Sequence, residues 1–158
     1  MRTETTIVID RPIQEVWAYL DDHRNDLVWR RPSLPKLEQL GTGPVGLGTR
    51  FEGVIAIGPR KYPYVNEITV YEPPNRVAWK AISSAGWMIG REGSYTLDAD
   101  GDRRTRMIHS ITLEPNRFAG KLVAPLVSRM GTSLVMIPLK QLKQTLEQQP
   151  SGPVGRQN

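Results

Sequence analysis

Val65-Asn-Glu-Ile-Thr-Val-Tyr-Glu-Pro-Pro-Asn-Arg-Val-Ala-Trp79 is the stretch that decides the fold, because it holds two strand-like runs joined by a very short connection. The runs on either side of Pro73-Pro74-Asn75 are rich in β-branched and aromatic residues, which favour extended structure. Parallel pairing would need a crossover of about a dozen residues or more. The stretch therefore predicts a hairpin in an antiparallel sheet.

Runs of the same kind lie on both sides of this hairpin. Between residues 34 and 115, strand-like segments alternate with turns that are rich in glycine, proline or aspartate. The first residues of the chain add one more β-branched run. Together these runs predict seven strands, at 3–10, 34–40, 49–57, 62–71, 76–83, 87–97 and 104–113.

Three further segments have the apolar spacing of helices. Residues 12–20 place apolar side chains at i, i+3, i+4 and i+7, and a second short helix is expected over 26–31. Residues 118–146 carry an apolar stripe that recurs about every four positions, which predicts a short helix or turn before Pro125 and then a long amphipathic helix with a kink expected at Pro138. Pro125 and Pro138 leave its course open, since proline interrupts helix interiors. An antiparallel sheet that buries such a helix is an α+β fold.

The order and spacing of these motifs resemble a known superfamily. Ile13-Gln-Glu-Val-Trp-Ala-Tyr-Leu-Asp21 is similar to the opening helix of START-like (SRPBCC) proteins, and Trp29 follows it as in that superfamily. The 65–79 hairpin resembles the superfamily's strand–proline–strand hairpin. Tyr95-Thr-Leu97 with Thr105 resembles its penultimate hairpin, and Leu139–Glu147 the end of its closing helix. Within the superfamily, the polyketide cyclase/dehydrase and lipid-transport family is the most similar.

This resemblance spans residues 3–148 and implies a helix-grip fold. In that fold a curved seven-stranded antiparallel sheet wraps around a long C-terminal helix, with two short helices after the first strand and a hydrophobic cavity between. We expect a single domain over 3–148 and a flexible, polar tail over 149–158.

Composition excludes several kinds of chemistry. The chain has 158 residues, no cysteine and two histidines. A disulfide scaffold, a thiol nucleophile, a cysteine-type zinc site and a three-histidine metal site are therefore impossible. Gly41–Gly46 matches G-x-G-x-x-G, but it leads into a strand rather than a helix and is interpreted as a hairpin loop. We expect no cofactor.

A polar cluster follows the first helix. It could hold a metal or gate a ligand, but solvated polar residues are usual just past a helix end, so we expect no metal site. Its members are Asp21, Asp22, His23 and Asp26.

The charge pattern and the N-terminus bear on partners and location. The net charge is +5, but the basic residues are scattered, which predicts mild surface basicity and no nucleic-acid binding. No signal peptide is evident, and no apolar run approaches the ~18 residues of a membrane span. We expect a cytoplasmic monomer or homodimer without stable membrane association.

The last predicted hairpin carries the sharpest functional signal. On 104–113 the more apolar face, which should point toward the helix, holds Met107, His109 and Ile111. A loop of odd length over 98–102 would keep the inner face of 87–97 on the same side. That inner face carries Trp87, Ile89, Arg91, Gly93 and Tyr95.

In this register His109 lies opposite Arg91 or Gly93, where glycine leaves room for a ring or a ligand. Tyr95, Arg91 and His109 could then form a polar spot in an apolar cavity. Three roles stay open for His109: a buried histidine satisfied by a neighbour, a ligand contact, or an acid–base catalyst. A neighbouring guanidinium would favour the neutral imidazole, which suits a hydrogen bond or a general base. His109 is the best catalytic candidate.

Further cavity candidates come from the aromatic residues and the long helix. Asn66 shares a strand face with Tyr64, Ile68 and Val70, so an inward Asn66 would be a buried polar group in need of a partner. Trp17 is expected to serve packing alone. The remaining candidates are Trp29 and Trp79, with Leu126 and Met130 on the helix.

These features predict a protein that carries, senses or mildly processes a small hydrophobic or aromatic molecule in an internal cavity. Two alternatives remain because the fold hosts all three classes. One is a polyketide cyclase/dehydratase-type enzyme, and the other is a co-chaperone-like interaction module without an open cavity.

Overall fold

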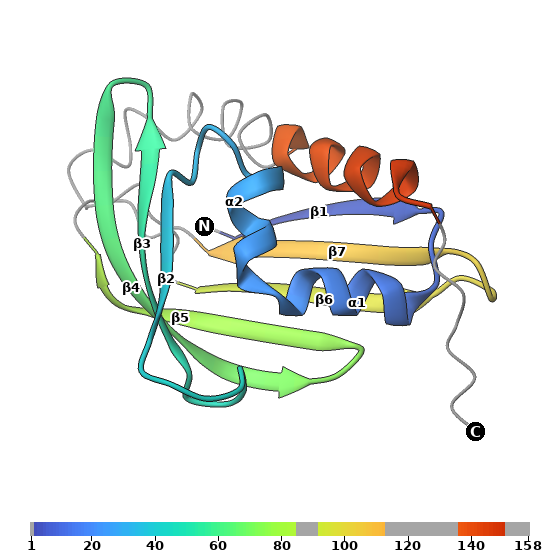
Figure 1. Ribbon diagram of the computed structural model, residues 1–158, viewed down its shortest axis with the longest axis horizontal. Coiled ribbons are helices and arrows are strands. Elements are labelled where there is room, and N and C mark those ends of the chain that lie inside the picture. The colour runs from blue at the N-terminus through green and yellow to red at the C-terminus, as the bar shows by residue number, and fades with distance from the viewer. Residues whose placement is uncertain (1, 85–91, 113–135, 151–158) are drawn as a thin grey trace.

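A seven-stranded antiparallel sheet forms the body of the protein, with strand order β1-β7-β6-β5-β4-β3-β2 (Figure 1). The structure is a computed structural model that describes residues 2–84, 92–112 and 136–150. All seven predicted strands are present. They are β1 (Arg2–Ile9), β2 (Lys36–Leu40), β3 (Arg50–Ile57), β4 (Arg60–Glu72), β5 (Arg76–Ser84), β6 (Glu92–Ala99) and β7 (Thr105–Thr112).

The predicted short helices follow β1 as α1 (Ile13–Asp21) and α2 (Asp26–Trp29), joined by the 3-10 turn η1 (His23–Asn25). A C-terminal helix covers residues 136–148 and includes Pro138. The preceding residues 113–135, with Leu126 and Met130, lie outside the described residues. In the described parts of the chain, no helix has both the length and the apolar character needed to span a membrane.

The main hydrophobic core lies where the C-terminal helix packs on the β1–β7–β6 half of the sheet (Figure 1). The apolar stripe of that helix is fully buried there, and each such side chain contributes about 1.5–3 kcal/mol. Lys143 Nζ donates a hydrogen bond to the Val8 carbonyl (2.6 Å), and Glu147 Oε1 accepts one from the Asp10 N–H (2.9 Å). The stripe consists of Leu139, Leu142 and Leu146, packed against Ile7, Ile9, Leu97 and Met107.

The β6–β7 hairpin confirms the predicted faces but not the predicted register. Met107, His109 and Tyr95 are buried on one face. His109 pairs with Tyr95, however, and Gly93 pairs with Ile111, so the prediction that His109 lies opposite Arg91 or Gly93 is wrong. The cause is the turn, which falls two residues later than expected. The Asp100 N–H closes it on the Arg104 carbonyl (2.9 Å).

Strand β4 contains a bulge that changes which side chains face inward. Ile68 pairs with Trp79 and Val70 with Ala78, so Thr69 is an extra residue in the ladder. A bulge of this kind reverses the in–out alternation beyond it. Tyr71 therefore points inward, and the prediction that Val70 shares the inward face of Tyr64 and Ile68 is wrong.

The glycine-rich segment at 41–48 joins β2 to β3, which pair antiparallel. It is a hairpin loop, as the sequence predicts.

Candidate functional site

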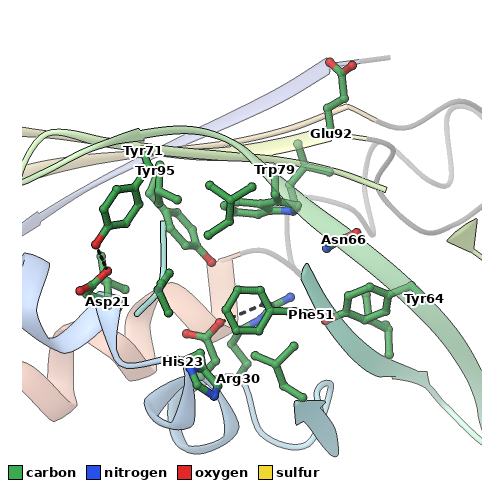
Figure 2. A pocket seen from close by; sticks show the side chains of 18 of the residues that line it. Asp21, His23, Arg30, Phe51, Tyr64, Asn66, Tyr71, Trp79, Glu92 and Tyr95 are labelled. Carbon is green, nitrogen blue, oxygen red and sulfur yellow. Dashed lines mark hydrogen bonds and ion pairs between the residues drawn. The ribbon is translucent and has the colours of Figure 1, made fainter. Parts of the chain in front are cut away.

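A pocket lies between the helical segment α1–η1–α2 and the inner face of the sheet (Figure 2). The empty space between its walls is about 1010 Å³, a volume that includes space open to solvent. From the helical side it is lined by Trp17, Leu20, Asp21, His23, Asp26 and Arg30. From the strands and loops it is lined by Leu37, Val45, Phe51, Ile55, Tyr64, Asn66, Ile68, Tyr71, Val77, Trp79, Glu92, Tyr95 and Ile111.

Two aromatic rings of the wall lie across glycines of the neighbouring strands. Trp79 pairs with Gly93, and Tyr64 pairs with Gly53. A Cβ atom at Gly93 would lie 2.6 Å from Cε2 of Trp79, and one at Gly53 would lie 2.8 Å from Cε1 of Tyr64. The room that Gly93 leaves is thus filled by the indole, which is a ring and not a ligand, the two occupants that the sequence left open.

A cluster of rings connects this wall to the core. The Tyr95 ring lies 4.9 Å from Trp79 and 4.9 Å from His109, measured between ring centroids. Trp29 meets Tyr95 edge-on at 6.2 Å and is buried behind the pocket, not in its lining. These stacked and tilted contacts fix the orientation of Trp79 and Tyr95.

His109 is buried behind this wall. It is not among the residues that line the pocket, and the rings of Tyr95 and Trp79 lie against it. Burial, with a smaller contribution from the Arg30 guanidinium, lowers the pKa of His109 to about 3. The imidazole is therefore neutral, and its Nδ1 has no hydrogen-bond partner among the described residues.

The neutral form expected for His109 is thus present, but burial is its main cause. The described guanidinium beside it is that of Arg30, whereas Arg91 lies outside the described residues. Met107 also lies behind the wall, fully buried in the core.

A charged pair lies on the helical side of the pocket. Asp26 Oδ1 accepts a hydrogen bond from Trp29 Nε1 (3.0 Å), and Asp26 Oδ2 lies 3.6 Å from Arg30 Nη1. Burial raises the pKa of Asp26, while Arg30 and the bond from Trp29 oppose that rise. The Arg30 guanidinium also lies 5.7 Å from the centroid of the Trp29 ring, so both partners are held in place.

A second polar contact joins the end of α1 to the bulged strand β4 (Figure 2). Tyr71 Oη donates a hydrogen bond to Asp21 Oδ1 (2.8 Å), and the Trp17 ring meets the Tyr71 ring edge-on at 5.7 Å. Burial and this hydrogen bond raise the pKa of Tyr71 to about 12. Trp17 thus lines the pocket in addition to its packing role.

Asn66 is a polar residue on the sheet side of the pocket. Its Oδ1 is buried and, among the described residues, has no hydrogen-bond partner. It pairs across the strands with Phe51, whose ring lies 5.0 Å from that of His23. The inward, unsatisfied Asn66 foreseen from the sequence is therefore present.

Some of the site residues predicted from the sequence line the pocket. Of the candidates, Tyr64, Asn66, Trp79, Tyr95 and Ile111 line it, whereas Trp29, Gly93, Met107 and His109 lie behind the lining. Trp87, Ile89, Arg91, Leu126 and Met130 lie outside the described residues.

Sequence reasoning missed most of the helical side of the pocket. Asp21, His23 and Asp26 belong to the polar cluster for which ligand gating was one alternative, so a signal was present. Arg30 and Tyr71 gave no comparable signal. Within the described ranges, no three potential metal-ligating side chains come together.

Three solved structures have the same fold. A protein from Thermus thermophilus (TTHA0849) is 21% identical, with a TM-score of 0.76, over 92% of this chain and 97% of that one. The Zhui aromatase/cyclase from Streptomyces sp. R1128 is 16% identical, with a TM-score of 0.72, over 98% and 99%. Norcoclaurine synthase from Thalictrum flavum, solved with dopamine and hydroxybenzaldehyde, is 15% identical, with a TM-score of 0.69, over 96% and 89%.

These likenesses confirm the helix-grip fold expected from the sequence. No curated protein matches the sequence. The family model described as polyketide cyclase/dehydrase and lipid transport matches residues 1–147, nearly the whole chain. The chain therefore belongs to the polyketide cyclase/dehydrase and lipid transport family.

Proposed function

We propose that this protein binds a small aromatic molecule that carries a hydrogen-bond donor. The observation that carries the proposal is Asn66 Oδ1, an acceptor buried in the pocket wall without a partner among the described residues. A buried acceptor without a hydrogen bond costs about 1–3 kcal/mol, and a donor on a ligand would recover much of that cost.

The walls around Asn66 support an aromatic ligand. Trp79, Tyr95 and Phe51 line the pocket with ring faces and edges, and rings prefer offset or edge-on contact with other rings. The solved neighbours support the same class: one is an aromatase/cyclase, and another was solved with dopamine and hydroxybenzaldehyde. The presence of an open pocket favours binding over the interaction module without a cavity.

Acid–base processing of the ligand is a second candidate, favoured by Asp26. Its carboxyl group lines the pocket, and burial raises its pKa above the ordinary value of 3.8, which is the direction that suits a general acid. His109, the candidate from the sequence, lies behind Tyr95 and Trp79 and does not reach the pocket.

Thermal unfolding with a panel of hydroxylated aromatic molecules tests the proposal. A ligand at a hundredfold excess over its Kd adds about 2.7 kcal/mol, which raises Tm by about 5–10 °C for a domain of this size. Asn66→Leu removes the acceptor and should lower affinity about tenfold, while the unliganded protein keeps its stability. Thr69→Val, on the exposed side of the same strand, is the matched control and should bind as the parent does.

Mass spectrometry of the recovered ligand separates the two candidates. An unchanged ligand supports a carrier or sensor, and a ligand that has lost water supports cyclase/dehydratase chemistry. If no aromatic molecule shifts Tm, or if Asn66→Leu binds as tightly as the parent, the proposal is wrong.

A further inference from the structure

The end of the pocket formed by α1 and β4 carries a carboxylate whose negative charge has no partner among the described residues. Asp21 accepts one hydrogen bond, from the neutral Tyr71 hydroxyl (2.8 Å). Two neighbouring carboxylates form ion pairs, Asp22 with Arg24 and Asp26 with Arg30. Asp21 forms none with the described residues. A neutral hydroxyl satisfies one lone pair and leaves the charge uncompensated.

The helix itself adds to the negative potential at this end. Asp21 is the last residue of α1, and the carbonyl groups of a final helical turn carry partial negative charge. Lysine and arginine are favoured in the last turn of a helix, yet the last turn of α1 has no basic residue. A cation would therefore be stabilised by both the carboxylate and the helix end.

Two aromatic rings lie near Asp21. Trp17 and Tyr71 line the pocket beside Asp21, and their rings meet edge-on at 5.7 Å. The faces of such rings attract cations, most strongly where water is excluded. Figure 2 shows Asp21 and Tyr71 together at one side of the pocket, away from His23 and Arg30.

The arginine among the described residues that line the pocket, Arg30, already has an acidic partner. Arg30 lies 3.6 Å from Asp26 and over the Trp29 ring, so the pair is close to neutral as a unit. Two side chains of the lining can accept a further hydrogen bond: Asn66 Oδ1 has no partner among the described residues, and Asp21 accepts one bond from a neutral hydroxyl. Although the chain carries a net charge of +5, these two side chains present acceptors to a ligand.

We propose that the Asp21 end of the pocket binds a protonated amine, so that the ligand is an aromatic amine and not an aromatic acid. This inference rests on the proposed function, since it adds a charged group to the same aromatic ligand, at a position away from Asn66 (Figure 2). The ammonium group lies against the Asp21 carboxylate and the Trp17 and Tyr71 rings, and the aromatic part extends toward Trp79 and Phe51.

Three probes with one ring system test this assignment: naphthylethylamine, naphthylethanol and naphthylacetic acid. Their affinities for the full chain are measured by calorimetry at neutral pH, where the amine is cationic and the acid anionic. We expect the amine to bind about tenfold more tightly than the alcohol, and the acid to bind more weakly than the alcohol. The amine's advantage should shrink as salt is added.

Asp21→Asn removes the charge but keeps an oxygen for the Tyr71 hydroxyl. In this variant the amine should lose its tenfold advantage, while the affinity of the alcohol stays within about twofold. Asp22→Asn is the matched control, because Asp22 precedes η1 outside the pocket and asparagine also caps a helical turn. It should bind all three probes as the parent does.

The results distinguish the two proposals. If the alcohol binds and the amine binds no more tightly, the amine assignment is wrong and the proposed function stands. If Asp21→Asn and Asp22→Asn weaken the amine equally, the assignment to Asp21 is wrong. If none of the probes and no member of the hydroxylated panel binds, both proposals fail.

Discussion

Substituting Gly93 with alanine tests how the pocket wall is built. The Trp79 indole lies across Gly93, and a Cβ atom there would be 2.6 Å from Cε2 of the ring. Carbon atoms in contact normally lie about 3.5–4.0 Å apart. The ring must therefore move by about 1 Å, because the backbones of β5 and β6 are tied by their hydrogen-bond ladder.

The cost follows from this displacement. Overpacking a well-packed site costs about 1–3 kcal/mol. For a domain of this size, each kcal/mol lowers Tm by about 2–4 °C, so Gly93→Ala should lower it by about 2–12 °C. The ring moves toward the pocket that it lines, so the variant should also lose affinity for aromatic ligands.

Thermal unfolding and ligand titration measure both effects. Gly46→Ala is the matched control, because a Cβ atom at Gly46 would meet nothing within 4 Å, and its Tm should stay close to that of the parent. A Trp79→Ala background supplies a double-mutant cycle, since removing the indole should abolish the cost of alanine at position 93.

Two results would refute the reasoning. If Gly93→Ala unfolds at the same temperature as the parent, the Trp79 indole is not in close contact with Gly93. If the loss in Tm is the same in the Trp79→Ala background, the cost arises from the backbone and not from the ring.

Two pH-dependent predictions concern Tyr71 and His109. The folded pKa of Tyr71, about 12, lies above its ordinary value of 10.0, so the phenol's contribution to stability is complete below pH 10 and is lost as pH rises toward 12. Tyr71→Phe should cost about 1 kcal/mol at neutral pH and show a smaller alkaline loss in thermal unfolding; an equal alkaline loss would contradict the assignment. The folded pKa of His109, about 3, lies below its ordinary 6.5, so its contribution is complete above pH 6.5 and is lost as pH falls toward 3. His109→Phe should unfold less readily than the parent in that acid range, and identical acid profiles would show that His109 is not the cause.

The strands and their faces could be predicted from the sequence because side chains alternate between the two faces of a strand, and this alternation is visible within a short stretch of residues. Apolar alternation placed Met107 and His109 inward, and the structure confirms this. Register depends instead on where the turn closes. The bond between the Asp100 N–H and the Arg104 carbonyl sets it, and nothing in the alternation distinguishes this turn from one that closes two residues earlier.

The bulge at Thr69 shows a second limit. Alternation continued through Ile68 predicts an inward Val70, whereas one extra residue in the ladder brings Tyr71 inward. The sequence around Thr69 contains no glycine or proline to mark the irregularity. Tyr71, which the pocket uses, was therefore missed.

The helical side of the pocket was hard to predict for a different reason. Asp21 ends α1, Asp26 begins α2 and Arg30 follows α2, and polar residues are ordinary at the ends of helices. Their role depends on how η1 and α2 fold back over the sheet, which is a tertiary relation between segments far apart in sequence. Gly93 had a similar ambiguity, because a glycine that makes room does not specify which ring fills it.

The glycine–aromatic pairs at 93 and 79 and at 53 and 64 also constrain how the pocket can change during evolution or engineering. A side chain added at either glycine while its aromatic partner remains must displace the ring and lowers stability, whereas the aromatic residue can be replaced by a smaller one first without a clash. The less costly order therefore begins with the aromatic residue, and its intermediate is a protein with a larger pocket. On that path, the admission of new and bulkier ligands comes before the wall is rebuilt.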